Sequence, residues 1–334
     1  MKIWLSSMAV AAGLAAGAVA VFAQWPAYPT GVPKGPDGKA DLTAPTPRTA
    51  DGKPDFSGTW QLGRAGGGGR AGGGGGGRGR GGAQAKGAPA PGGTPDPAGT
   101  PAAGGPPAAG GPPAAGGPAA ARGPGGARVC NPQTPTEGPP LATFANIGAN
   151  FPGCLPPLTP WAANVLTQRK AENSKDNPDA HCLPLGLMQL HEHPQPRKII
   201  QTPGVIVILY EAQAGVRQIF TDGRALPKND PQPWWYGYSI GHWDGDTLVV
   251  ETTGFRDDVW LDIDGSPLTN SGKMTERMRR LNYGTLQTDV TIEDPKAYTK
   301  PFTVRVMHRL MPDTDLIEFI CGENERSDAH LVGK

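Results

Sequence analysis

Short segments in which apolar and polar residues alternate follow one another after Arg197, and they constrain the fold more than any other feature. Successive side chains of a strand point to opposite faces, so this alternation predicts β-strands with one buried face. Turn-forming pairs such as Asp222-Gly223 and Asp294-Pro295 separate the segments. The expected strands cover residues 198–202, 205–210, 216–221, 236–243, 246–253, 273–281, 286–293, 302–310 and 316–321.

Eight or nine short strands joined mostly by tight turns form a meander. A sheet of this length keeps two open edges unless it closes, and closure into a barrel removes both edges. The sequence therefore predicts an all-β fold, an antiparallel up-and-down barrel of about eight or nine strands. Strands do not alternate with helices, which excludes the Rossmann and TIM-barrel arrangements. One short helix is expected, with Thr159 as its N-cap, Pro160 at its first position and an end near Asn173.

The composition divides the chain into four parts. Residues 1–23 combine one basic residue with an Ala-rich apolar run, which indicates a secretory signal peptide. Residues 24–62 form a Pro-rich lead-in with one possible short strand at residues 56–62. Residues 63–128 consist mainly of Gly, Pro and Ala, and they predict a disordered linker because so few large apolar residues cannot offset the chain entropy. Residues 129–334 hold the expected barrel domain.

Charge and hydropathy argue against two kinds of partner, nucleic acids and the interior of a membrane. Residues 129–334 carry 19 basic and 25 acidic residues, and this excess of negative charge argues against a nucleic acid. Gly-Arg runs in the linker resemble RNA-binding segments, but no aromatic residue lies among them for base stacking. No segment after residue 23 is apolar enough to span a bilayer, so we expect an exported protein of the periplasm or the extracellular space. The alternative is an uncleaved N-terminal anchor. No feature predicts an oligomeric state.

Four cysteines, Cys130, Cys154, Cys182 and Cys321, lie in the expected barrel domain. In an exported chain they indicate two disulfide bonds, and three pairings are possible. We favour Cys130–Cys154 with Cys182–Cys321, because the second bond would tie the segment before the barrel to its last strand. None of the cysteines shows the Cys-x-x-Cys spacing of a zinc or redox site.

The hairpin around Asp244-Gly245 carries the sharpest site prediction. This dipeptide favours a two-residue turn of type I′, which would place Tyr238 opposite Glu251. If this face points into the barrel, its apolar neighbours raise the pKa of the Glu251 carboxyl towards the range of a general base, and the phenol orients it. The alternative is a buried hydrogen bond between the two that fixes the strand register. His242 shares this face.

Charged and aromatic residues in nearby turns and loops are further candidates for ligand binding. Arg224 could hold an anionic group beside Asp222, which is also a typical turn residue. Trp260 lies in an acidic loop, where it could stack on a ring of a ligand or simply cover the barrel end. Asp262 and Asp264 in the same loop faintly suggest calcium, but their spacing is not that of an EF-hand.

The strand that contains Glu276 and Arg277 places a carboxylate between two methionines. Glu276 is either a functional group inside the barrel or the partner of an arginine on the next strand. Arg277 is a second candidate for holding an anion.

His191-Glu192-His193 is the one His-x-His sequence in the chain, and two prolines follow it closely, so we expect a loop. Because no partner at metal-ligand spacing is visible, we expect no metal site. No P-loop, dinucleotide fingerprint or nucleophile elbow occurs either, so we expect no cofactor.

Several distinctive strings lie in the second half of the chain. They are Arg217-Gln-Ile-Phe-Thr-Asp-Gly-Arg224, Gly237-Tyr-Ser-Ile-Gly241, Trp243-Asp-Gly-Asp-Thr-Leu-Val-Val-Glu-Thr-Thr-Gly-Phe255, Thr275-Glu-Arg277, Asp294-Pro-Lys-Ala-Tyr-Thr-Lys-Pro301 and Cys321-Gly-Glu-Asn-Glu325. Spanning roughly residues 154–334, they resemble a family of exported bacterial proteins of unknown function. Gly58-Thr59-Trp60 looks like the Gly-x-Trp motif of lipocalin-like barrels, in which the Trp plugs one end. The resemblance implies a lipocalin-like barrel and an exported location.

Three functions are compatible with these features. The first is an exported barrel that binds a small molecule in a pocket of mixed aromatic and carboxylate character. The second is a cofactor-free isomerase, lyase or hydrolase with Glu251 as its acid or base and Arg224 or Arg277 holding an anion. The third is a surface interaction protein whose linker supplies reach. The pocket of the binding protein would contain Tyr238, Glu251, Glu276 and Arg277, with Trp260 as a cap.

Overall fold

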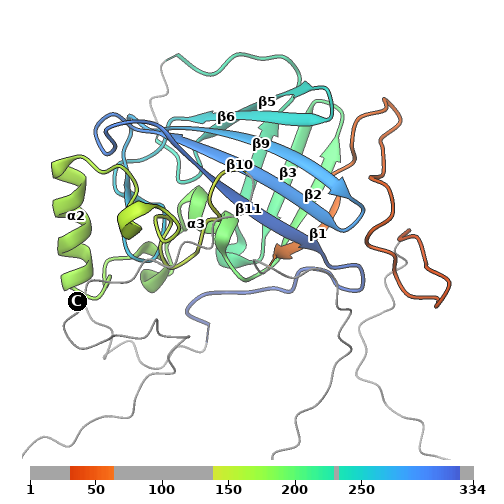
Figure 1. The fold of residues 1–334 in the computed structure, drawn as a ribbon, viewed down its shortest axis with the longest axis horizontal. Helices are drawn as coiled ribbons and strands as arrows, with labels where there is room; N and C mark the ends of the chain where they lie inside the picture. The colour runs from red at the N-terminus through yellow and green to blue at the C-terminus, as the bar shows by residue number, and fades with distance from the viewer. Residues whose placement is uncertain (1–30, 64–137, 229–232, 324–334) are drawn as a thin grey trace, which may run out of the picture. The chain divides into compact units, whose positions relative to one another are not determined.

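The computed structural model describes residues 31–63, 138–228 and 233–323, and these contain a closed, mainly antiparallel β-barrel (Figure 1). Its nine strands follow one another around the barrel in the order β1-β11-β10-β9-β6-β5-β4-β3-β2. The predicted all-β barrel is thus confirmed. The strands are β1 (Gly58–Leu62), β2 (Arg197–Thr202), β3 (Val205–Tyr210), β4 (Val216–Phe220), β5 (Tyr238–Asp244), β6 (Thr247–Thr253), β9 (Lys273–Asn282), β10 (Thr285–Glu293) and β11 (Phe302–Leu310), with a separate pair formed by β7 (Val259–Trp260) and β8 (Pro267–Leu268).

One seam of the barrel differs from an up-and-down meander. β4 and β5 run parallel, and they pair only through Ile219 with Ser239 and Phe220 with Ile240. The other neighbouring strands in the barrel are antiparallel. The β4–β5 seam therefore has fewer backbone pairs than a continuous antiparallel ladder would supply.

The barrel closes through the lead-in and not through the C-terminal segment. The prediction of a last strand at residues 316–321 is wrong, because these residues form no strand and Ile317, Phe319 and Ile320 are exposed. β1 takes that place and pairs with both β11 and β2. Its Trp60 is fully buried, which gives this short strand an apolar anchor.

Two α-helices and three short 3-10 helices accompany the strands in the described residues. α2 (Pro160–Ala171) begins as predicted, because the Thr159 side chain accepts a hydrogen bond from the N–H of Ala162 at 3.2 Å. α3 (Leu187–Glu192) contradicts the prediction of a loop at His191-Glu192-His193. Every residue of α3 is buried, so packing stabilises a helix that is too short to persist alone. The 3-10 helices are η1 (Pro152–Cys154), η2 (Pro178–His181) and η3 (Ala212–Ala214).

Residues 31–57 cover the end of the barrel at the β9–β10 turn. The N–H groups of Tyr283 and Gly284 in this turn donate to the carbonyls of Ala44 and Leu42. The ring of Phe56 contacts that of Trp243, with 5.4 Å between ring centroids.

α3 and residues 138–158 lie at the opposite end. Leu187 and Met188 of α3 belong to one hydrophobic cluster, and Leu190 belongs to the other. Because α3 joins both clusters, it fills the interior rather than lying on the surface. No helix in the described part of the chain is long and apolar enough to cross a membrane.

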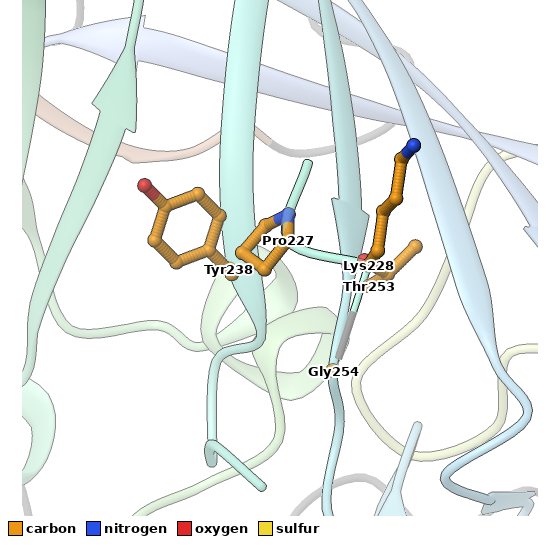
Figure 2. A pocket seen from close by; sticks show the side chains of 5 residues that line it. All are labelled: Pro227, Lys228, Tyr238, Thr253 and Gly254. Carbon is orange, nitrogen blue, oxygen red and sulfur yellow. The ribbon is translucent and has the colours of Figure 1, made fainter. Parts of the chain in front are cut away.

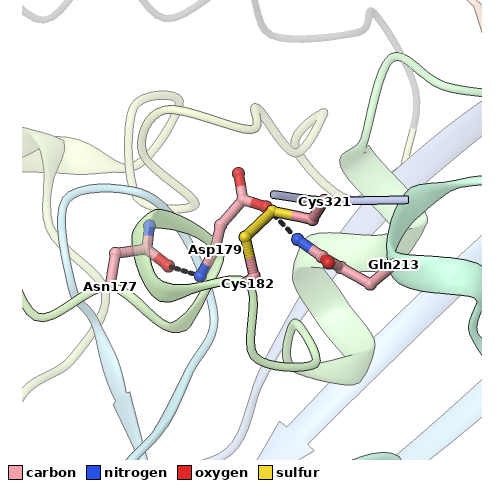
Figure 3. The surroundings of a disulfide bond; sticks show 5 residues. All are labelled: Asn177, Asp179, Cys182, Gln213 and Cys321. Atoms are coloured by element: carbon pink, nitrogen blue, oxygen red, sulfur yellow. Dashed lines mark hydrogen bonds between the residues drawn. A yellow bond between two sulfur atoms is a disulfide. The ribbon is translucent and has the colours of Figure 1, made fainter. Parts of the chain in front are cut away.

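The disulfide bond between Cys182 and Cys321 confirms one predicted pairing (Figure 3). It attaches the C-terminal segment to the end of η2, where Gln213 Nε2 donates to Asp179 Oδ1 at 2.8 Å. The other predicted pairing involves Cys130, which lies outside the described residues, as do the predicted signal peptide and, apart from Gly63, the predicted linker.

Replacing Cys321 by Ser should lower the free energy of unfolding by about 2–4 kcal/mol, because the bond closes a long loop in the unfolded chain. Cys182 and Cys321 are separated by 139 residues. Urea unfolding of C321S and of C182S/C321S measures this loss, and the two variants should be equally destabilised. An unchanged unfolding midpoint in both would contradict the structural role of the bond.

Candidate functional site

The interior of the barrel beside α3 contains an unusual number of polar and ionisable side chains. They come from α3 and from seven strands, and all are almost completely buried. A buried ionisable group destabilises the folded protein unless it is paired or hydrogen-bonded, so the effect of each group on stability depends on its contacts. The group, called here the interior polar cluster, consists of His191, Glu192, Arg197, Tyr210, Arg217, Ser239, Thr252, Glu276 and His308.

Glu276 on β9 lies at the centre of this cluster. Arg217 NH1 donates to its Oε1 at 3.0 Å, and Arg217 NH2 donates to its Oε2. His191 Nε2 lies 2.8 Å from Oε1. Burial alone would raise the pKa of Glu276, but the charge of Arg217 and the contact with His191 outweigh burial and hold the pKa well below its ordinary value. Glu276 is therefore an ionised, fully paired carboxylate.

Arg217 also links the strands on either side of the parallel seam. From β4 its Nε donates to Ser239 Oγ on β5 at 3.2 Å, and its NH2 donates to Thr252 Oγ1 on β6 at 3.1 Å. With the ion pair to Glu276, a single side chain on β4 bonds to side chains of three other strands. These bonds supplement the two residue pairs of the β4–β5 ladder.

His191 connects α3 to β2 and β11, the two strands that flank β1. Its Nδ1 lies 3.3 Å from Arg197 NH1 on β2, and its carbonyl accepts bonds from Arg197 NH2 at 3.0 Å and from His308 Nε2 at 2.9 Å. Burial lowers the pKa of His191, and it lowers the pKa of His308 still further. Both imidazoles are therefore neutral at pH 7, and the contacts fix α3 inside the barrel.

The central prediction for the hairpin is wrong in its register. The turn is formed by Gly245 and Asp246, with Asp244 paired to Thr247, so the pairing slides and Glu251 faces Ile240. Tyr238 faces Thr253 instead. The conformation of Gly245, with φ of +57°, suits either placement of the turn, so the dipeptide alone did not decide between them.

The predicted orientation of that face is also wrong. Tyr238 and Glu251 do share one face, but it is the outer face of the barrel, where His242 is exposed. Glu251 is bonded to Lys273 Nζ at 2.6 Å, and both side chains are about one-third exposed. The inner face carries Ser239 and Gly241 on β5, where small side chains leave room for Ile219 and the long arm of Arg217.

Trp260 and Asp262, the loop residues predicted to bind a ligand, are both buried and contact other parts of the protein. Trp260 is buried, with the Arg169 guanidinium 4.4 Å from its ring centroid. Asp262 is also buried and accepts hydrogen bonds from the N–H groups of Ile147, Gly265 and Ser266 and from the Ser266 hydroxyl. Its carboxylate is saturated by protein donors. No group of three or more His, Cys, Asp or Glu suited to hold a metal ion occurs among the residues that the structure describes.

For Glu276 both predicted alternatives describe part of the arrangement. The carboxylate does lie inside the barrel, and it is paired with an arginine. That arginine is Arg217 on β4, however, and not a residue of the adjacent strand. Arg277, the next residue, lies on the outer face and pairs with Asp244 at 2.8 Å.

The outer face carries a pocket of about 310 Å³ beside Tyr238 (Figure 2). Pro227, Lys228, Thr253 and Gly254 form its other walls. A volume of this size is at the lower end of the range for small-molecule sites, roughly 300–1,000 Å³.

Two of the predicted binding residues support the Tyr238 wall of this pocket. Arg224 NH1 donates to the Tyr238 hydroxyl at 3.1 Å, while its NH2 donates to Asp222 Oδ2 at 2.6 Å. The Arg224 guanidinium also covers the ring of Phe220, 3.8 Å from the centroid, and Phe220 stacks on Tyr238. The structure thus brings Asp222, Arg224 and Tyr238 together on the outer surface.

Comparison of the chain with models of known families, with curated proteins and with solved structures gave no match.

Replacing Arg217 by Met should destabilise the protein by about 3–5 kcal/mol, because it leaves the Glu276 carboxylate buried without its cation. Glu276→Gln should have a similar effect for the reciprocal reason. The double variant R217M/E276L should lose less than the sum of the single changes, since it leaves no isolated charge. Arg277→Met, which breaks an exposed ion pair on the same strand, serves as the control and should change the unfolding midpoint little. Additive losses would contradict a coupled pair.

The pH dependence of stability should report on the buried histidines. His191 and His308 have lowered pKa values in the folded protein, whereas both titrate near 6.5 when unfolded. Below pH 6.5 the unfolded chain binds protons at these positions that the folded protein does not bind, so each histidine removes up to about 1.4 kcal/mol of stability per pH unit as the pH falls. The raised pKa of Glu192 acts in the opposite direction, because its carboxyl keeps a proton in the folded protein that the unfolded chain releases. Urea unfolding of the parent and of His308→Gln between pH 7 and 5.5 therefore measures a difference in slope: His308→Gln should lose less stability on acidification than the parent does, and equal slopes would refute this reading.

Proposed function

We propose that this protein is an exported β-barrel that binds a small molecule in the pocket beside Tyr238 on its outer face. The ligand carries a negative charge next to a flat apolar part. The observation that carries the proposal is the pocket itself, in which aromatic and cationic groups meet. The disulfide bond supports export, because such bonds persist in oxidising compartments. The resemblance to exported bacterial barrels points in the same direction.

The apolar part of the ligand would lie against Tyr238 and Pro227, which line the same pocket. The Tyr238 ring is held on one side by Phe220, at 5.3 Å between centroids, and through its hydroxyl by Arg224. A ring fixed in this way loses little conformational freedom when a ligand stacks on it, so less binding energy is spent on ordering.

The negative charge would be attracted by Lys228. Its side chain is exposed, and no carboxylate lies within ion-pairing distance of it in the part of the chain that the structure describes. Arg224, by contrast, is already paired with Asp222. Lys228 therefore supplies the charge, and Arg224 positions the phenol.

Replacing Lys228 by Gln should weaken ligand binding by about tenfold, because one charge-assisted contact is lost. Tyr238→Leu should weaken it to a similar extent by removing the stacking surface and the Arg224 contact. Mass spectrometry of metabolites retained by the purified protein identifies the ligand, and calorimetry with that compound gives the affinities.

The controls are Arg277→Gln, a charge removed from the outer face away from the pocket, and Glu251→Gln. Both should bind as the parent does. Retention that is equal in K228Q, Y238L and the parent would place the ligand elsewhere. If instead the parent converts the retained compound and E251Q does not, the protein is an enzyme and the binding proposal fails.

A further inference from the structure

The interior polar cluster contains two buried arginines but one paired carboxylate. Arg217 and Glu276 neutralise each other through two hydrogen bonds. Arg197 is 2% exposed, and no carboxylate lies within ion-pairing distance of it among the described residues. Its charge thus lies in the interior without a contacting counter-charge, which is unfavourable unless something compensates it.

The hydrogen-bonding groups around Arg197 are incompletely used. Its NH1 and NH2 contact the side chain and the carbonyl of His191, but its Nε–H has no acceptor. The O–H of Tyr210, whose ring centroid is 5.6 Å from the Arg197 guanidinium, also has no acceptor, since its other charged neighbour, Arg217, can only donate. The N–H groups of the neighbouring Arg217 already donate to Ser239, Thr252 and Glu276. Two O–H or N–H donors therefore remain beside one unpaired cation.

Glu192 of α3 is the other acidic group of the cluster, and it does not pair with Arg197. It is fully buried, and neither carboxyl oxygen has a hydrogen-bond partner. Burial raises the pKa of Glu192 well above its ordinary value, and the charge of Asp262 adds to this. The histidines of the cluster, His191 and His308, are neutral, as argued above. The cluster as a whole then carries one excess positive charge.

We propose that the barrel interior binds a small monovalent anion beside Arg197, held by the Arg197 Nε–H and the Tyr210 hydroxyl. Buried polar groups in native proteins are almost always hydrogen-bonded, and an anion would satisfy both donors and the charge together. Because the cluster is almost completely buried, the anion we propose is a small one, a halide or a short carboxylate such as formate. This site is independent of the outer pocket, since it is lined by different residues from α3, β2 and β3.

The test uses the mature full-length protein and its Tyr210→Phe variant, unfolded thermally side by side in increasing sodium formate or bromide. Each salt also changes stability through its general effect on burial, and this effect is shared by both proteins. A ligand that binds only the folded state stabilises it in proportion to the logarithm of its concentration, so the Tm of the parent should rise with formate or bromide relative to that of Tyr210→Phe. Crystals grown in bromide should show anomalous scattering within contact distance of Arg197 Nε.

Tyr210→Phe, which keeps the ring and removes one donor, should weaken the anion effect about tenfold. Arg197→Gln should abolish the effect; if that variant does not fold, Y210F still carries the test. Glu192→Gln should keep the effect. The control Lys198→Gln removes the neighbouring cation of β2, which pairs with Asp315 on the outside, and should respond as the parent does.

Two results would overturn the proposal. The first is a Tm difference between the parent and Tyr210→Phe that stays constant as formate or bromide increases. The second is an E192Q variant that responds to these anions much more strongly than the parent does, which would identify Glu192 itself as the counter-charge of Arg197.

Discussion

Arg217 crosses the inside of the barrel from β4 and bonds to side chains of β5, β6 and β9. The position matters because β4 and β5 share only two residue pairs and run parallel, so the backbone alone supplies few bonds there. A buried guanidinium requires acceptors, and Ser239, Thr252 and Glu276 provide them. His191 on the same carboxylate then extends the network to α3. The β4–β5 seam and the position of α3 are thus both tied to one carboxylate, Glu276.

The filling of the barrel interior explains why we expect a ligand on the outer face. A ligand-binding barrel commonly uses its lumen, but here α3 and the interior polar cluster fill that space, and residues 31–57 cover the other end. The accessible combination of ring and charge lies outside, beside Tyr238. In the interior, the remaining unpaired charge is that of Arg197, which has no carboxylate within ion-pairing distance among the described residues.

The fold was largely predictable, and the site was not. Alternation with a period of two assigns Tyr238 and Glu251 to one face wherever the turn begins, so that part of the prediction survived an error in register. Which face is buried could not be read from the hairpin, since Ser239 and Gly241 look unlike core residues until Arg217 and Ile219 are placed against them. The partner of Glu276 is 59 residues away and joins it only through the closed topology. α3 was missed because tertiary burial, not local propensity, stabilises six helical residues.

Amide hydrogen exchange followed by mass spectrometry tests the central claim, that the Arg217–Glu276 pair holds the β4–β5 seam and α3 together. In the parent protein, amides of α3, β4 and β5 should exchange as slowly as those of the long β9–β10 ladder, through global unfolding. In R217M these three segments should exchange much faster than β9 and β10, because the seam opens locally. Uniform acceleration of all segments in R217M, or fast exchange of α3 in the parent, would contradict the account.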